Sequence, residues 1–192
     1  MRKYALLLLL TTLSIISFAQ DIPDLESLLK PKYESGEFKI SDEADKNFWR
    51  EKDEVVLICI DFILQSKDGF QNKNRTDMAS FVHEWIIKSK YDLPYQDKLA
   101  KELSGINMYV WYYYMLGASK KFLENKDKTQ TIFELQLLGL KTLRDYFSDK
   151  NNFDESSDID LPKILKDAFF IKLEKAKSDK KLKKIINHYA VK

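Results

Sequence analysis

The chain has 192 residues, with 32 Lys and Arg against 30 Asp and Glu, which gives a formal net charge of +2 at pH 7. This length fits one domain with a substantial core, and it requires no second domain. Because Cys59 is the single cysteine, no internal disulfide can form. The stability of the fold must therefore come from its core.

The first nineteen residues have the pattern of an export signal. Arg2 and Lys3 precede an apolar run over residues 4–16, which ends in Ser17-Phe18-Ala19. A basic start, a short apolar run and small residues before a break are typical of a cleavable secretory peptide. The run is shorter than the ~20 apolar residues that cross a bilayer. We therefore predict cleavage after residue 19, a periplasmic or extracellular location and no transmembrane segment in the mature chain.

Removal of residues 1–19 changes the charge balance of the chain. Only Arg2 and Lys3 are lost, so the mature chain carries 30 basic and 30 acidic side chains. The residue directly after the predicted cleavage site is Gln20 and not a cysteine, which argues against a lipid anchor there. We expect a signal peptide at 1–19, an N-terminal extension with a short helix at 20–41, and a helical domain at 42–192.

The composition favours an all-α fold. The chain has only five Gly and four Pro, and the turn pairs that mark hairpins are scarce. One apolar stripe recurs at helical spacing, formed by Met78, Phe81, Val82, Trp85 and Ile86. We therefore predict a single-domain bundle or short array of about seven helices in antiparallel hairpins.

The predicted helices follow from apolar periodicity, caps and breakers. In chain order they cover about 42–65, a segment opened by Thr76 or Asp77, 94–103, a segment from beyond Gly105 to near Glu124, 129–148, a segment capped by Asp160 with Pro162 in its first turn, and a final helix after Ser178. The short link at 125–128 predicts an antiparallel hairpin. Gly117 and Gly139 nearly mirror each other about this link. They predict either a close helix crossing or two tolerated glycines.

The densest aromatic cluster lies in one predicted helix and consists of Tyr109, Trp111, Tyr112, Tyr113 and Tyr114. Four consecutive aromatic residues cover every face of a helix, so this element should be central. One interpretation is a pocket for an apolar or carbohydrate ligand, with the five aromatic residues as its lining. The alternative is an ordinary aromatic core.

Catalytic and metal-binding patterns are incomplete. His83-Glu84 begins like a zinc-peptidase motif, but Ile87 stands where the second histidine belongs. Cys59 lies among apolar neighbours in a predicted helix, where a structural thiol is expected. The acidic loop holds Asp154, Glu155, Asp158 and Asp160, yet it lacks the glycine and ligand order of a calcium-binding EF-hand. We therefore predict no catalytic residue, no metal site and no cofactor.

The C-terminal end is strongly basic. Residues 163–192 hold ten lysines against three acidic residues, and the cluster includes Lys180, Lys181, Lys183 and Lys184. This end could contact anionic envelope polymers or lipid headgroups. The alternative is a solvated lysine face that the acidic remainder of the chain partly neutralises. Arginine and interleaved aromatic residues are lacking, so we expect no nucleic-acid partner.

Several packing residues together resemble a group of uncharacterised exported helical proteins of Gram-negative bacteria. They are Phe81-Val82-x-x-Trp85, the segment 117–125, Gly139-Leu140-Lys141 and the lysine-rich final helix. The resemblance implies an extracytoplasmic bacterial setting and brings no catalytic or binding residues with it.

The sequence thus predicts an exported, non-enzymatic binding or structural protein of the cell envelope, whose partner is an unknown protein or envelope polymer. The alternative is a binder of small apolar ligands that uses a pocket around residues 109–114, and a hydrolase with dispersed catalytic residues comes third. A polar-lined cavity would favour the small-ligand alternative. A filled core with an exposed apolar groove would favour a protein partner.

Overall fold

The computed structural model describes residues 46–67, 73–153 and 159–190, together with residues 31, 34, 35 and 157. These residues form nine α-helices, one short 3-10 helix and no strand, which confirms the predicted all-α bundle. The contacts divide the chain into residues 1–37 and 38–192, and all nine helices belong to the second unit. The predicted signal peptide at 1–19 and nearly all of the extension at 20–41 lie outside the described residues.

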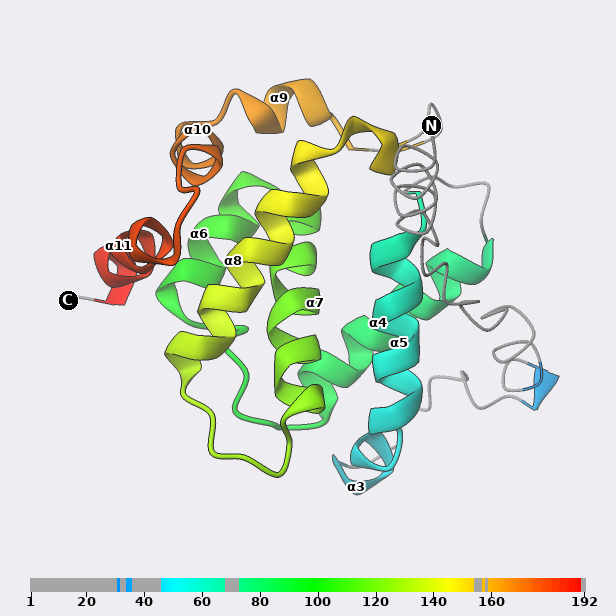
Figure 1. Cartoon of the computed structure of the whole chain (residues 1–192). Coiled ribbons are helices and arrows are strands. Elements are labelled where there is room, and N and C mark those ends of the chain that lie inside the picture. Colours follow the sequence, from blue (N-terminus) through cyan, green and yellow to red (C-terminus); the bar gives the residue numbers. More distant parts are fainter. Residues whose placement is uncertain are drawn as a thin grey trace, which may run out of the picture. The chain divides into compact units, whose positions relative to one another are not determined.

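The helices are labelled in Figure 1. In chain order they are α3 (Lys46–Arg50), α4 (Asp53–Gln65), α5 (Lys73–Lys88), α6 (Lys98–Ile106), α7 (Met108–Glu124), α8 (Ile132–Ser148), the 3-10 turn η2 (Lys150–Asn152), α9 (Leu161–Leu165), α10 (Ala168–Glu174) and α11 (Asp179–Ala190). None of these described helices is long and apolar enough to cross a membrane.

Helix α7 is the central element of the bundle, as its aromatic sequence predicts. It contacts α4, α5, α6 and α8, and it runs side by side with α8 in an antiparallel hairpin (Figure 1). Asn107 begins α7, because its side chain accepts a hydrogen bond from the Tyr109 backbone N–H at 2.8 Å. Thr131 and Glu134 begin α8 with a reciprocal capping box.

The two mirrored glycines lie where α7 and α8 cross. A Cβ atom added at Gly139 would lie 2.7 Å from the Tyr114 carbonyl oxygen, and one added at Gly117 would lie 3.0 Å from the Gly139 Cα. Real Cβ atoms hardly ever approach other atoms below about 3 Å, so only glycine fits here. The predicted close crossing of the two helices is confirmed.

The predicted first helix at 42–65 is wrong in one respect, because it is interrupted at Glu51 and Lys52. The turn separates α3 from α4 and lets Trp49 pack, fully buried, against Phe81 of α5. Arg50 also donates hydrogen bonds to the backbone carbonyls that follow α5. These contacts are tertiary, so the local periodicity of residues 42–65 does not contain them.

Other predicted boundaries shift by a few residues because the capping side chain differs from the expected one. Helix α6 begins after Asp97, whose carboxylate accepts from the Ala100 N–H at 2.7 Å, and not at Pro94. Gly105 lies inside α6, and the break falls at Asn107. Helix α5 begins at Lys73, upstream of the predicted start, and α8 begins at Ile132.

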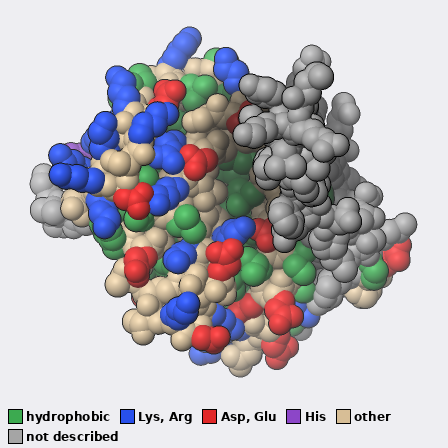
Figure 2. Space-filling model, viewed as in Figure 1, with side chains coloured by type: hydrophobic (Ala, Val, Ile, Leu, Met, Phe, Trp, Pro, Cys, Tyr) green, Lys and Arg blue, Asp and Glu red, His purple; other side chains and the backbone are tan. Residues whose placement is uncertain are grey.

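The C-terminal helices α9, α10 and α11 cover one edge of the bundle, where α10 and α11 pack against α8 and α11 also contacts α6. Asp160 caps α9 as predicted, with Pro162 in the first turn. Helix α11 buries Leu182, Ile185 and Ile186 and turns its lysines to the surface. Figure 2 shows the blue Lys and Arg side chains gathered over this edge.

Candidate functional site

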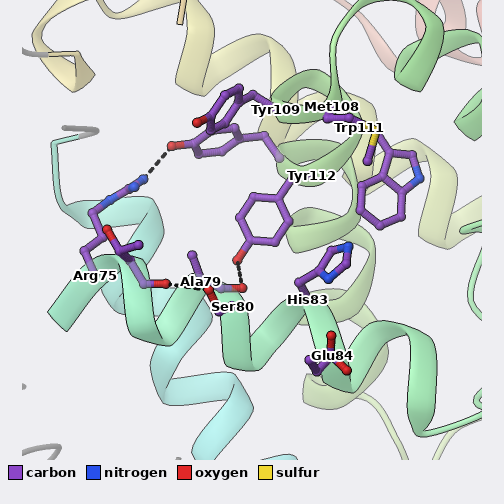
Figure 3. A pocket seen from close by; sticks show the side chains of 11 residues that line it. Arg75, Ala79, Ser80, His83, Glu84, Met108, Tyr109, Trp111 and Tyr112 are labelled. Atoms are coloured by element: carbon purple, nitrogen blue, oxygen red, sulfur yellow. Dashed lines mark hydrogen bonds between the residues drawn. The ribbon is translucent and has the colours of Figure 1, made fainter. Parts of the chain in front are cut away.

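A groove of about 520 Å³ runs between α5 and α7. Helix α7 contributes Met108, Tyr109, Trp111, Tyr112 and Tyr113, and helix α5 contributes Arg75, Thr76, Ala79, Ser80, His83 and Glu84 (Figure 3). Aromatic and aliphatic side chains make up most of the wall. Its ionisable groups, apart from the tyrosine hydroxyls, are those of Arg75, His83 and Glu84, and all three come from α5.

The groove exists because α5 has an apolar face that packs in the core and a second face with small side chains toward α7. Its apolar stripe, which includes Phe81 and Trp85, is fully buried in the core. On the other face, the small side chains of Ala79 and Ser80 lie opposite α7. Tyr112 spans the space, and its hydroxyl donates a hydrogen bond to the Ala79 carbonyl at 3.1 Å. The tyrosine therefore ties the two helices together while the small residues leave room beside it.

One end of the groove is formed by a buried arginine. Arg75 is 6% exposed, and its guanidinium donates to the Tyr113 hydroxyl at 2.5 Å and to the Ser66 hydroxyl at 3.0 Å. Tyr113 in turn stacks on Tyr146 with ring centroids 4.1 Å apart. The hydroxyl groups fix the position of the positive charge beside an aromatic wall.

The other end of the groove combines an indole and an imidazole. The His83 ring meets the edge of Trp111 with centroids 5.7 Å apart, and Trp111 donates its indole N–H to the Tyr95 carbonyl at 3.2 Å. Glu84 forms an ion pair with Lys88 at 2.8 Å. Met108, at 57% exposure, supplies a flexible apolar rim.

The groove does not present an arrangement for nucleophilic chemistry. The Ser80 hydroxyl donates to the Thr76 carbonyl at 3.1 Å within its own helix. A nucleophilic serine would instead be held by a base at hydrogen-bond distance. The wall offers apolar surface with a few polar groups, which suits binding.

The structure divides the predicted aromatic cluster between two environments. Tyr109, Trp111, Tyr112 and Tyr113 line the groove, whereas Tyr114 is absent from its lining and packs fully buried against Gly139. Within the described part of the chain the Tyr114 hydroxyl has no hydrogen-bond partner, and burial raises its pKa well above the ordinary value. Ligand binding by the other four aromatic residues stays a prediction.

The α5 half of the groove was missed by the sequence analysis. The signal was present, because Arg75, Ala79 and His83 recur every four residues, as do Thr76 and Ser80. This stripe mixes charged, small and polar residues, so it resembles an ordinary solvated helix face. Only its position opposite α7 distinguishes it.

A second polar cluster, around Asp53, has a structural role. The buried Asp53 carboxylate accepts hydrogen bonds from the Trp85 indole at 2.9 Å, the Tyr91 hydroxyl at 2.7 Å and the Lys126 ammonium at 2.5 Å. Burial raises the pKa of Tyr91, and the hydrogen bond to Asp53 raises the pKa of Lys126. The cluster joins the start of α4 to α5 and to the link before α8.

The remaining predicted positions are Cys59 and the acidic loop. Cys59 is fully buried, as expected of a structural thiol. Asp160 caps α9, while Asp154, Glu155 and Asp158 lie outside the described residues. Across the described ranges, His, Cys, Asp and Glu form no group of three or more that could hold a metal ion.

The predicted C-terminal lysines are all exposed. They are Lys180, Lys181, Lys183 and Lys184. Lys183 lies over the Phe133 ring at 5.6 Å, and Lys181 donates to the Lys175 carbonyl at 3.4 Å. In the described part of the chain none of the four forms an ion pair with a carboxylate.

No known protein family, curated protein or solved structure matches this chain. The resemblance to exported helical proteins of Gram-negative bacteria therefore stays a prediction.

Proposed function

We propose that the protein is an exported, non-enzymatic binding protein that takes an apolar segment of a partner polypeptide into the α5–α7 groove. The observation that carries this proposal is an exposed apolar groove beside a filled core. The export part rests on the pattern of residues 1–19, with its basic start and short apolar run.

The groove has the chemistry of a helix-binding or peptide-binding surface. Such surfaces receive apolar side chains spaced along one face of the partner. Tyr109 provides a rigid, partly exposed contact area, and Met108 adapts to the shape of an incoming side chain. Arg75 and His83 at opposite ends of the groove offer polar contacts that would orient the segment.

A photo-crosslinking amino acid at position 80 tests the proposal in the native host. Ser80 lines the groove, and its hydroxyl bonds only within its own helix. Ser104 of α6 makes the same kind of bond, to the Lys101 carbonyl at 2.9 Å, and lies outside the groove lining, so it is the matched control. We expect a discrete polypeptide adduct from position 80, lost when Met108→Glu is added. Equal adducts from positions 80 and 104, or none from position 80, would contradict the proposal.

A small apolar molecule is the second candidate occupant, because a groove of about 520 Å³ falls within the usual size range of small-molecule sites. The dye 8-anilinonaphthalene-1-sulfonate is a suitable reporter. Saturable binding that Ser80→Trp abolishes and Ser104→Trp preserves would support this candidate. Binding that both variants preserve would place the dye elsewhere on the protein.

The export step has its own test. N-terminal sequencing of the protein from its native host should find Gln20, free or cyclised, as the first residue. Material that stays in the cytoplasm with Met1 still present would refute export and leave the groove proposal untouched.

A further inference from the structure

A second hollow, of about 250 Å³, lies between the end of α10 and the outer face of α11. Ala176 and Ile185 form its floor, and both side chains are almost fully buried. Four lysines surround the floor: Lys172, Lys175, Lys181 and Lys184. We call these four residues the lysine rim. The rim combines an apolar floor with a ring of ammonium groups.

Neighbouring acids compensate the positive charge of the rim only in part. All four lysines are exposed, and no carboxylate lines the hollow. The nearest acidic residue at the start of α11, Asp179, is instead paired with Lys141 of α8 at 2.8 Å, and this bond lowers its pKa. In the described ranges no rim lysine forms an ion pair. Glu174 is the exposed acidic neighbour of Lys175 at the end of α10, so the four rim lysines leave this surface with a net positive charge.

An exposed isoleucine extends the apolar surface beside the rim. Ile171 is 41% exposed and precedes Lys175 by one helical turn, so the two side chains share a face of α10. Buried apolar residues in this region, such as Leu173, point into the bundle, whereas Ile171 does not. The face thus carries both charge and exposed apolar surface.

We propose that the lysine rim and Ile171 form a surface that binds anionic phospholipid membranes. The ammonium groups would meet the lipid phosphates, and the exposed Ile171 would meet the acyl boundary. A wholly hydrophilic polysaccharide would make no apolar contact with Ile171. Nucleic acid fits less well, because arginine and aromatic side chains are absent from the hollow. The inference is independent of the α5–α7 groove.

Sedimentation with vesicles tests the proposal. The vesicles contain equal parts phosphatidylglycerol and phosphatidylcholine, or phosphatidylcholine alone, and the protein is used as the host secretes it, with the same N-terminus in every variant. We expect binding to the anionic vesicles only, weakened by salt because exposed charges are screened. Replacement of the four rim lysines by glutamine should weaken binding at least about tenfold.

A matched variant separates this surface from total charge. Lys98, Lys101, Lys128 and Lys150 are exposed lysines outside the C-terminal helices, and none forms an ion pair in the described ranges. Their replacement by glutamine removes the same charge and should change binding less than about twofold. Circular dichroism confirms that each variant is folded, and the double variant Lys181→Glu with Lys184→Glu makes the same change in charge with two substitutions at the same site.

Ile171→Ser distinguishes a lipid surface from a soluble polyanion. It should weaken vesicle binding about threefold, because it removes apolar contact, and leave binding to dextran sulfate unchanged. Three results would each overturn the proposal: equal losses of vesicle binding in the two quadruple variants, no binding of the wild type to anionic vesicles, or vesicle binding that Ile171→Ser leaves unchanged. The last result would assign the rim to a soluble polyanion.

Discussion

Helix α7 meets its neighbours α8 and α5 in opposite ways. On the α8 side, Gly139 lets the helices approach until the Tyr114 backbone and ring fill the space above its Cα. On the α5 side, the Tyr112 side chain reaches across to the Ala79 carbonyl, and a groove of about 520 Å³ stays open beside it. The same aromatic run therefore closes one interface and leaves the other one open.

The difference shows that the residues of the facing helix determine whether an aromatic residue of α7 is packed in the core or lines the groove. A glycine opposite a tyrosine allows contact between backbones, so the ring is buried and its hydroxyl loses access to water. On the α5 side, Tyr112 is held by its hydrogen bond to the Ala79 carbonyl. The small side chains of Ala79 and Ser80 leave the space beside this tyrosine open. Interiors are close-packed, so the closed side should tolerate little change and the open side much more.

Gly139→Ala should have the largest effect, because it forces a Cβ atom into the closed interface. That atom would lie 2.7 Å from the Tyr114 carbonyl oxygen, which cannot move without shifting α7. We expect the free energy of unfolding to fall by about 3 kcal/mol, as for an overpacked core. Urea unfolding followed by circular dichroism measures the change.

Gly105→Ala is the control for helix propensity. Gly105 lies within α6, and an added Cβ would meet nothing within 4 Å. This variant should be stabilised by about 0.5 kcal/mol, because alanine restricts the unfolded chain. A similar loss of stability in both variants would show that the close approach at Gly139 is unimportant.

Tyr113→Phe should come next, because Tyr113 accepts a hydrogen bond from the buried Arg75 guanidinium. Hydrogen bonds to charged groups are the stronger ones, so we expect a loss of about 2 kcal/mol. Tyr112→Phe removes the half-buried bond to the neutral Ala79 carbonyl and should cost about 0.5 kcal/mol. Equal losses for the two tyrosines in urea unfolding would show that the buried bond to Arg75 stabilises the protein no more than the bond to Ala79 does.

Tyr114→Phe should stabilise the protein by about 1 kcal/mol at neutral pH, because it removes a buried hydroxyl without a described partner. The variant should also resist alkali better. Burial raises the pKa of Tyr114, so its folded-state pKa lies above the unfolded value of about 10. Ionisation of this phenol therefore leaves the stability of the wild-type protein unchanged below pH 10 and lowers it as the pH rises above that value.

Urea unfolding at a series of pH values checks this prediction. The advantage of Tyr114→Phe over the wild type should grow above about pH 10. Part of the loss of stability at alkaline pH should remain in the variant, because burial also raises the pKa of Tyr91 and Tyr189. A constant difference between the two proteins across the alkaline range would show that the Tyr114 phenol does not contribute to the pH dependence.

Local sequence signals predict much of this fold. The stripe that includes Phe81 and Trp85 is buried, the helices at 108–124 and 132–148 form a hairpin, and Asp160 and the residues after Ser178 begin helices. These features depend on periodicity and capping within one segment. The glycine crossing could also be predicted, because the two glycines lie at matched distances from one link.

Only the α7 half of the groove could be predicted from the sequence. The aromatic residues of α7 attract attention in the sequence, but their division between core and groove depends on what each one faces. Ala79 and Gly139 are small residues in different helices, and only the packing of three helices places them on opposite sides of α7. The interruption between α3 and α4 has the same cause, since Trp49 and Arg50 make their contacts with a distant helix.

Ser80→Trp should change the stability least and the binding surface most. Ser80 is exposed on the open side, so a large side chain there extends over the groove without displacing a buried atom. The free energy of unfolding should stay within about 0.5 kcal/mol of the wild-type value, as for most surface substitutions. Ser104→Trp, made on α6 at another serine bonded within its own helix, should match it in urea unfolding. A loss of more than about 2 kcal/mol in Ser80→Trp alone would mean that the α5 side of α7 is as tightly closed as the α8 side. In that case the groove would not be open to a ligand, and the proposed binding function would fail with it.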